Sequence, residues 1–158
     1  MYFAGGESVS IQIHANKEGI LGPSDLQLRC DYAPENGKPV SGSNIQAKIN
    51  DAFKNIVSFE KDSNGLDPTF SSNGIYLSSR ANLSNPTPSL PNTVILTFNQ
   101  LECKDEREYR CTVTERVDGK YETIPSHATS IVVKGKYTWL LMTKLRELKV
   151  LVYCIWSQ

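Results

Sequence analysis

Two cysteines in the segment LECKDEREYRCTV, residues 101–113, have the spacing that most invites a chemical interpretation. Cys103 and Cys111 stand eight positions apart, and acidic residues and a tyrosine lie between them. Such a pair can belong to a metal site, to two redox-active thiols, or to a structural corner next to a disulfide. The three interpretations imply different compartments and different functions.

The metal and redox interpretations fit the rest of the sequence poorly. A structural zinc site needs four ligands at spacings such as C-x₂₋₄-C, whereas Cys103 and Cys111 are further apart. His14 and His127 have no ligand partner near them in the sequence, and no C-x-x-C motif occurs. We therefore expect no metal and no cofactor.

Catalytic motifs are missing as well. The sequence contains no H-E-x-x-H, no G-x-S-x-G and no glycine-rich phosphate loop, and its acidic residues are spread through loops. Cys103 could serve as a nucleophile paired with His127, but a lone cysteine and histidine in a β domain are far more often structural. We expect a protein that is not an enzyme.

The amino-acid composition indicates the broad class of protein. The chain has 158 residues, of which 39% are hydrophobic, so one domain with a packed core and some additional chain is expected. Lys and Arg total 17, as do Asp and Glu, and this balance gives no electrostatic case for nucleic acid. The first ten residues lack the basic start and apolar run of a secretory signal. The chain therefore follows a removed signal, is a fragment, or stays in the cytosol.

Residues 8–134 have the pattern of short strands separated by turns. Apolar residues alternate with polar ones, the period of a half-buried strand, and turn residues recur about every ten positions. This pattern predicts an all-β fold, a two-sheet antiparallel sandwich. The expected strands are 8–14, 25–30, 44–50, 55–61, 75–80, 93–101, 108–117 and one within 122–134, with loops at 31–43, 62–74 and 85–92.

The last 23 residues have a different character. Residues 136–158 are mostly apolar, but four charged residues interrupt them, and each would cost about 2.5–3.5 kcal/mol near a bilayer centre. We expect no membrane span in this chain and interpret this segment as a helical or poorly ordered tail. The predicted organisation is an extension at 1–7, a domain at 8–135 and the tail at 136–158.

Two of the four cysteines should point into the core. Cys30 alternates with apolar residues on one strand, and Cys111 does so on another. The facing sheets of a sandwich lie about 10 Å apart, so cysteines from the two sheets can meet and form a bridge. The remaining cysteines, Cys103 and Cys154, can pair with each other, pair with another chain or stay free.

These residues carry a resemblance to a known family. The motifs L-x-L-x-C at 26–30 and D-x-x-x-Y-x-C at 105–111 resemble those of the immunoglobulin superfamily, in its variable or intermediate type, over about residues 8–135. The resemblance implies a Cys30–Cys111 disulfide. It also implies that Tyr109 is the tyrosine of the corner and that Asp105 accepts a charged partner, for which Arg80 is the candidate.

The sequence departs from the family in the corner and in the core. Arg107 stands where the family usually has a small residue between the aspartate and the tyrosine, and no tryptophan occurs before residue 139. Ala47 or Ile49 should fill the space of the missing core tryptophan. The expected core consists of Leu26, Leu28, Ile45, Ala47, Ile49, Leu96, Phe98, Leu101 and Val113.

Function should therefore be sought in loops at one end of the sandwich, since sandwiches bind through their loops or through a sheet face. The resemblance places loops 31–43 and 116–127 at the same end. Tyr32, Asn36, Tyr121 and Glu122 are the candidate binding residues, because tyrosine offers large contact area at low entropic cost. The alternative is that these are ordinary solvated loop residues.

The resemblance implies an extracellular recognition or adhesion module, secreted or part of a receptor, that binds a protein or glycan partner, with another immunoglobulin domain as one such protein. Asn82 begins an N-glycosylation sequon, which agrees with that setting. One alternative is a structural immunoglobulin domain of an intracellular filament, with Cys30 and Cys111 reduced. The second alternative is an enzyme or metal protein that uses Cys103.

Overall fold

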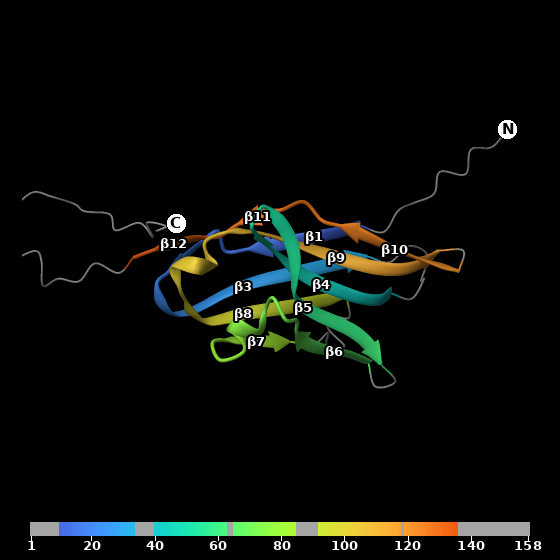
Figure 1. The fold of residues 1–158 in the computed structure, drawn as a ribbon, viewed down its shortest axis with the longest axis horizontal. Coiled ribbons are helices and arrows are strands. Elements are labelled where there is room, and N and C mark those ends of the chain that lie inside the picture. The colour runs from blue at the N-terminus through green and yellow to red at the C-terminus, as the bar shows by residue number, and fades with distance from the viewer. Residues whose placement is uncertain (1–9, 34–39, 63–64, 85–91, 118, 136–158) are drawn as a thin grey trace, which may run out of the picture.

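Two antiparallel sheets face each other in the computed structural model, which describes residues 10–33, 40–62, 65–84, 92–117 and 119–135 (Figure 1). The first sheet has the strand order β1 (Ser10–Ala15), β3 (Gly22–Ala33), β8 (Thr93–Leu101) and β7 (Ala81–Ser84). The second has the order β10 (Lys120–Pro125), β9 (Glu108–Val117), β4 (Val40–Ile49), β5 (Ala52–Asp62) and β6 (Gly65–Phe70), and β11 (Thr129–Ser130) also pairs with β9. The predicted all-β sandwich is confirmed.

Short elements complete the sandwich. Strand β2 (Glu18–Ile20) pairs in parallel with β12 (Val132–Lys134), and this pairing closes one side of the fold. Two 3₁₀ turns, η2 (Ile75–Leu77) and η3 (Cys103–Asp105), precede β7 and β9. In the described part of the chain, no helix is long and apolar enough to cross a membrane. The predicted segments 1–7 and 136–158 lie outside the described residues.

Strands β5 and β6 give the second sheet its variable-type character, because they extend it beyond β4 in the position of the two additional strands of variable domains. A tight hairpin joins β4 to β5 through Asn50 and Asp51. Both residues have positive φ, 51° and 60°, which suits a primed two-residue turn. Asn and Asp tolerate this conformation better than other non-glycine residues do.

The core lies between the two sheets and follows the period-two pattern. Eight of the expected core residues are 3% exposed or less, from Leu26 at 3% to Leu28 and Phe98 at 0%. Ile49 is the exception and is only partly buried, because it stands at the last position of β4 beside the hairpin turn. The small side chain of Ala47 is fully buried in this core.

The pattern breaks at one β-bulge. Ile45 pairs with Val57 and Gln46 pairs with Asn55, so Ile56 is an additional residue on β5. Ile56 and Val57 are consecutive, and both are fully buried. Because of the bulge, Asn55 lies opposite Gln46 on the face of the sheet turned away from the core.

Residues 75–80 do not form the expected strand. Residues Ile75–Leu77 form the turn η2, in which Ser78 N donates to Ile75 O at 3.1 Å, and the strand begins only at Ala81. The packing at Gly74 explains the turn, because a Cβ there would come within 1.8 Å of the Ile56 carbonyl oxygen. The chain can approach β5 this closely only with a glycine at that position.

Candidate functional site

A disulfide joins the two sheets at their centre. Cys30 on β3 and Cys111 on β9 are bonded, with their Cα atoms 6.0 Å apart, and both side chains are 0% exposed. The predicted bridge is confirmed. Because it is fully buried, it is a structural link, inaccessible to a thiol in solution.

Tyr109 forms the corner that follows β8. Its hydroxyl donates a hydrogen bond of 2.8 Å to the Asp105 carbonyl oxygen, and its ring packs edge-on against Phe98 with centroids 6.3 Å apart. Burial raises the pKa of Tyr109 well above that of a free phenol, and the nearby charge of Asp105 adds to the effect. The phenol therefore stays protonated and serves as a hydrogen-bond donor in the corner.

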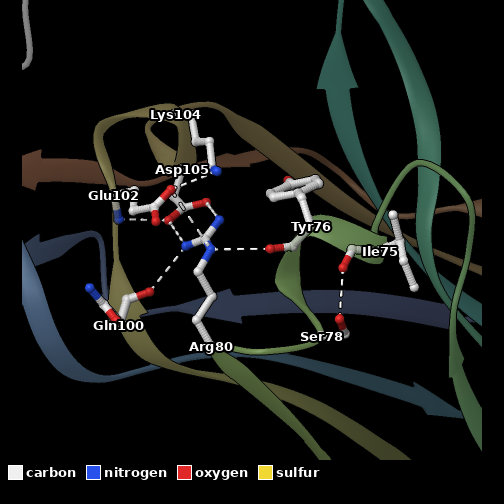
Figure 2. Close-up of polar contacts among 8 residues, drawn as sticks. All are labelled: Ile75, Tyr76, Ser78, Arg80, Gln100, Glu102, Lys104 and Asp105. Carbon is white, nitrogen blue, oxygen red and sulfur yellow. Dashed lines mark hydrogen bonds and ion pairs between the residues drawn. The ribbon is translucent and has the colours of Figure 1, made fainter.

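Arg80 and Asp105 form a bidentate ion pair beneath that corner, as Figure 2 shows. Nη2 lies 2.8 Å from Oδ1 and Nη1 contacts Oδ2, while the side chains of Arg80 and Asp105 are 5% and 0% exposed. Glu102 N also donates to Asp105 Oδ2 at 2.8 Å, and Arg80 Nη1 donates to Gln100 O at 3.0 Å. The two charges thus compensate each other and have additional backbone partners.

The pKa of Arg80 reflects this pairing. Burial alone would lower it, but the hydrogen bonds and the charge of Asp105 outweigh burial and raise the pKa above that of free arginine. The guanidinium therefore remains charged, and the pair links the turn before β7 to the turn before β9. This arrangement is a structural support and leaves neither group available for chemistry.

The ring of Tyr76 provides a contact for the Arg107 side chain beside the corner. Three cationic groups surround its ring: Arg80 Cζ and Lys104 Nζ each lie 5.3 Å from the centroid, and Arg107 Cζ lies 5.9 Å away. The large side chain of Arg107 fits at this position because its guanidinium lies near the Tyr76 ring, and aromatic rings attract cations. Burial is also the main reason that the pKa of Tyr76 is raised.

The predicted binding residues do not form one loop cluster. Tyr32 was expected in a loop, and this prediction is wrong: β3 continues to Ala33, and the alternation that buries Cys30 also turns Tyr32 inward, where it is 7% exposed. Burial raises the pKa of its hydroxyl. Asn36 lies outside the described residues.

Tyr121 and Glu122 lie on β10, an edge strand, rather than in a loop as expected. Tyr121 is 69% exposed and pairs with Arg116 of β9, while Glu122 pairs with Glu115. The strand starts at Lys120 because the turn through Gly119, with φ 81°, is short. Of the four candidate binding residues, Tyr121 is the one with a large, exposed side chain that a partner can contact.

The outer face of the second sheet, defined here as the side of β10, β9, β4 and β5 turned away from the core, carries an ordered polar network. Arg110 Nε donates to Gln46 Oε1 at 2.7 Å, and Gln46 Nε2 donates to Asn55 Oδ1 at 2.7 Å. The Arg110 Cζ atom lies 4.2 Å from the centroid of the Phe53 ring. Four residues from three strands therefore hold one another in place.

A second pair stands on the same face. Lys48 Nζ lies 2.6 Å from Glu108 Oε2, with side chains 39% and 43% exposed. The hydrogen bond that Lys48 donates to Glu108 is the main reason that the pKa of Lys48 is raised. Sequence reasoning did not single out this face, although the alternation of Tyr109 and Cys111 already predicts that Arg110 points away from the core.

The remaining candidates for chemistry lie on separate elements of the structure. Cys103 and His127 are exposed, on η3 and before β11. His14 Nε2 lies 3.4 Å from Asp31 Oδ2 on the outer side of the first sheet. Among the described residues, no group of three or more histidine, cysteine, aspartate or glutamate side chains has the geometry to hold a metal ion.

The strand order, the inter-sheet disulfide and the tyrosine corner together define an immunoglobulin-like domain of the variable type. A solved structure of murine CRIg has the same fold, with a TM-score of 0.58 and 19% sequence identity over 78% of this chain and 98% of that chain. No protein-family model matches the sequence, and no curated protein sequence matches it significantly. Because 1714 solved chains match the fold, the fold by itself specifies no function.

Proposed function

We propose that this domain is an extracellular, non-catalytic recognition module that binds a protein or glycan partner through the outer face of β10, β9, β4 and β5. The observation that carries the proposal is the network around Arg110, in which an arginine and an aromatic ring are held in fixed positions on an accessible sheet. Arginine and aromatic residues are enriched at binding hot spots. The exposed Tyr121 extends the same surface toward the β9–β10 hairpin.

The buried disulfide supports the extracellular part of the proposal, because such bonds persist in oxidising compartments and are rare in the cytosol. The competing function is a structural domain of an intracellular filament, in which Cys30 and Cys111 are thiols. Mass spectrometry of the protein purified from its natural source under non-reducing, alkylating conditions separates the two. Alkylated Cys30 and Cys111 would support the intracellular function.

Asn82 is a proposed glycosylation site. It is exposed on β7, where its amide lies 3.3 Å from the Asn99 side chain. In secreted protein from eukaryotic cells we expect a mass decrease on treatment with an N-glycosidase, and no such decrease in Asn82→Gln. Unmodified Asn82 in the secreted wild-type protein would contradict this proposal.

Binding itself can be tested with purified ectodomains and a glycan panel, measured by surface plasmon resonance. We expect Arg110→Ala or Tyr121→Ala to weaken the interaction by about tenfold or more, the effect of losing a hot-spot residue. Gln27→Ala is the matched control, because Gln27 is exposed on the opposite sheet. A partner that is lost in Gln27→Ala and retained in the other two variants would place the binding surface elsewhere.

A further inference from the structure

The guanidinium of Arg110 has the properties of a preformed receptor for an oxyanion. Its plane is fixed from two directions, by the hydrogen bond from Nε to Gln46 and by stacking over Phe53. Gln46 is itself oriented by Asn55, which accepts from its amide nitrogen and so turns the amide oxygen toward Arg110. An arginine held this way loses little side-chain entropy when it binds a ligand.

The charge of Arg110 is not neutralised within the described part of the chain. No carboxylate there lies within ion-pair distance of it, and the only hydrogen bond that its guanidinium donates to a described residue is the one from Nε. The neighbouring Glu108 on the same face is already paired with Lys48. The two Nη groups therefore keep their donors for a partner, and a partner can supply the missing negative charge.

We infer that Arg110 binds a carboxylate side chain, aspartate or glutamate, presented by a protein partner. The two free Nη groups match the spacing of carboxylate oxygens, which accept two parallel hydrogen bonds from one guanidinium. The pleated outer face and the Phe53 ring beside the arginine suit the broad apolar and polar contact of a protein surface. This inference rests on the proposed function, because it names the chemistry of the partner at the same face.

Gln46 and Phe53 act here as positioning residues. Loss of Gln46 should weaken carboxylate binding by freeing the guanidinium, without removing its charge. Arg110→Lys keeps the charge but loses the planar fork, so it should weaken binding as well. These two variants separate a positioned guanidinium from a simple positive charge.

The test is a nuclear magnetic resonance titration of the full chain that follows the Nε–Hε resonance of Arg110. The titrants are the peptide acetyl-Gly-Glu-Gly-amide, its glutamine counterpart, and 3′-sialyllactose as a glycan carboxylate. We expect the glutamate peptide to shift this resonance saturably, with millimolar affinity, and the glutamine peptide to shift it at least tenfold less. Gln46→Ala should weaken the glutamate peptide about threefold or more, and Gln27→Ala should leave its affinity unchanged.

Arg110→Lys is followed through the backbone amides of residues 46 and 53, and its unfolding temperature shows that the variant is folded. Equal responses to both peptides, or an unchanged affinity in Arg110→Lys, would overturn the inference. A response to sialyllactose alone would overturn it in favour of a glycan. If ectodomain binding depends on Tyr121 and not on Arg110, the inference fails while the proposed function stands. If the peptide binds at Arg110 but ectodomains bind elsewhere, the proposed function fails.

Discussion

At the scale of single residues, three charged side chains carry most of the information about this domain. Arg80 and Asp105 are charged side chains almost completely removed from water, and each compensates the charge of the other. Arg110 is a charged side chain on the surface, fixed in place but without a counter-charge among the described residues. The charges of Arg80 and Asp105 support the fold, and the charge of Arg110 is available to a partner.

The buried pair gives a direct prediction for stability. Asp105→Asn keeps the volume of the side chain but leaves Arg80 buried without a compensating charge, so we expect the free energy of unfolding to fall by about 3–5 kcal/mol. Urea unfolding measures this loss. Glu108→Gln is the control, since it removes the carboxylate of a solvent-exposed ion pair and should leave the urea midpoint close to that of the wild type. Equal midpoints for the two variants would contradict the prediction.

The buried tyrosines give a prediction for alkaline pH. The pKa of Tyr109 is raised well above the unfolded value of about 10, so above pH 10 the unfolded chain loses a proton that the folded chain keeps. Stability is therefore complete below about pH 10 and falls as pH rises, by up to about 1.4 kcal/mol per pH unit from this group.

The comparison to make is the pH dependence of urea unfolding between pH 8 and 10.5. Tyr109→Phe should lower stability at pH 8, by about 1 kcal/mol for the lost hydrogen bond to Asp105, yet show a shallower decline at high pH. Tyr32 and Tyr76 keep contributing in the same direction in that variant. An unchanged slope in Tyr109→Phe would show that its hydroxyl ionises in the folded protein as readily as in the unfolded one.

The residues of the corner and the disulfide could be predicted from the sequence, whereas the network around Arg110 could not, and the reason is physical. Asp105, Tyr109 and Cys111 lie within seven positions of each other, so their relation is visible locally. The partners of Arg110 come from other strands, with Gln46 64 positions away, and only the strand register brings them together. Without that register, Arg110 is indistinguishable from any solvated arginine.

At the scale of elements, regular strands were predictable and irregular backbone was not. The alternation of apolar residues located β1, β3, β4, β8 and β9 to within a few residues. The bulge at Ile56 breaks the alternation, and the turn η2 depends on the contact of Gly74 with β5, which lies about twenty residues earlier in the chain. Tyr32 was misplaced because the sequence does not show where β3 ends.

The disulfide between β3 and β9 gives the prediction at this scale. It closes a sequence separation of 81 residues, so its removal in Cys30→Ala/Cys111→Ala should cost about 4–5 kcal/mol by the loss of constraint on the unfolded chain. Cys111→Ala alone already opens the bridge, and we expect its urea midpoint to lie close to that of the double variant. A double variant as stable as the wild type would show that the bridge does not constrain the unfolded chain.

At the scale of the whole molecule, the supporting corner faces the core and the proposed binding surface faces away from it. The corner with η3 lies at the end of the sandwich where β12 ends, and the β9–β10 hairpin lies at the opposite end (Figure 1). Arg110 follows the corner closely along β9, but its side chain lies on the outer face of the sheet, with Gln46 and Phe53. The outer face belongs to one sheet only, so substitutions on it leave the inter-sheet core intact. This separation explains how one scaffold can present many different surfaces.

We propose that residues 8–135 form an independently folding unit, because the described strands between Ser10 and Lys134 enclose the core by themselves. A chain limited to residues 8–135 should unfold in a single cooperative urea transition, at nearly the same midpoint as the full chain. Circular dichroism at 218 nm and near-ultraviolet fluorescence should follow the same curve. A much lower midpoint for the shorter chain would mean that residues outside this range are part of the fold.

The central disulfide also determines how this domain would respond to mechanical tension. A force applied at its two ends can straighten only the chain outside the bridge, because the covalent link carries the load past the segment between Cys30 and Cys111. With the bridged positions 81 apart in the sequence, roughly 280 Å of extended length is withheld as long as the bond is intact. Reduction of this one bond would release that length, so the bridge sets the extensibility of the domain.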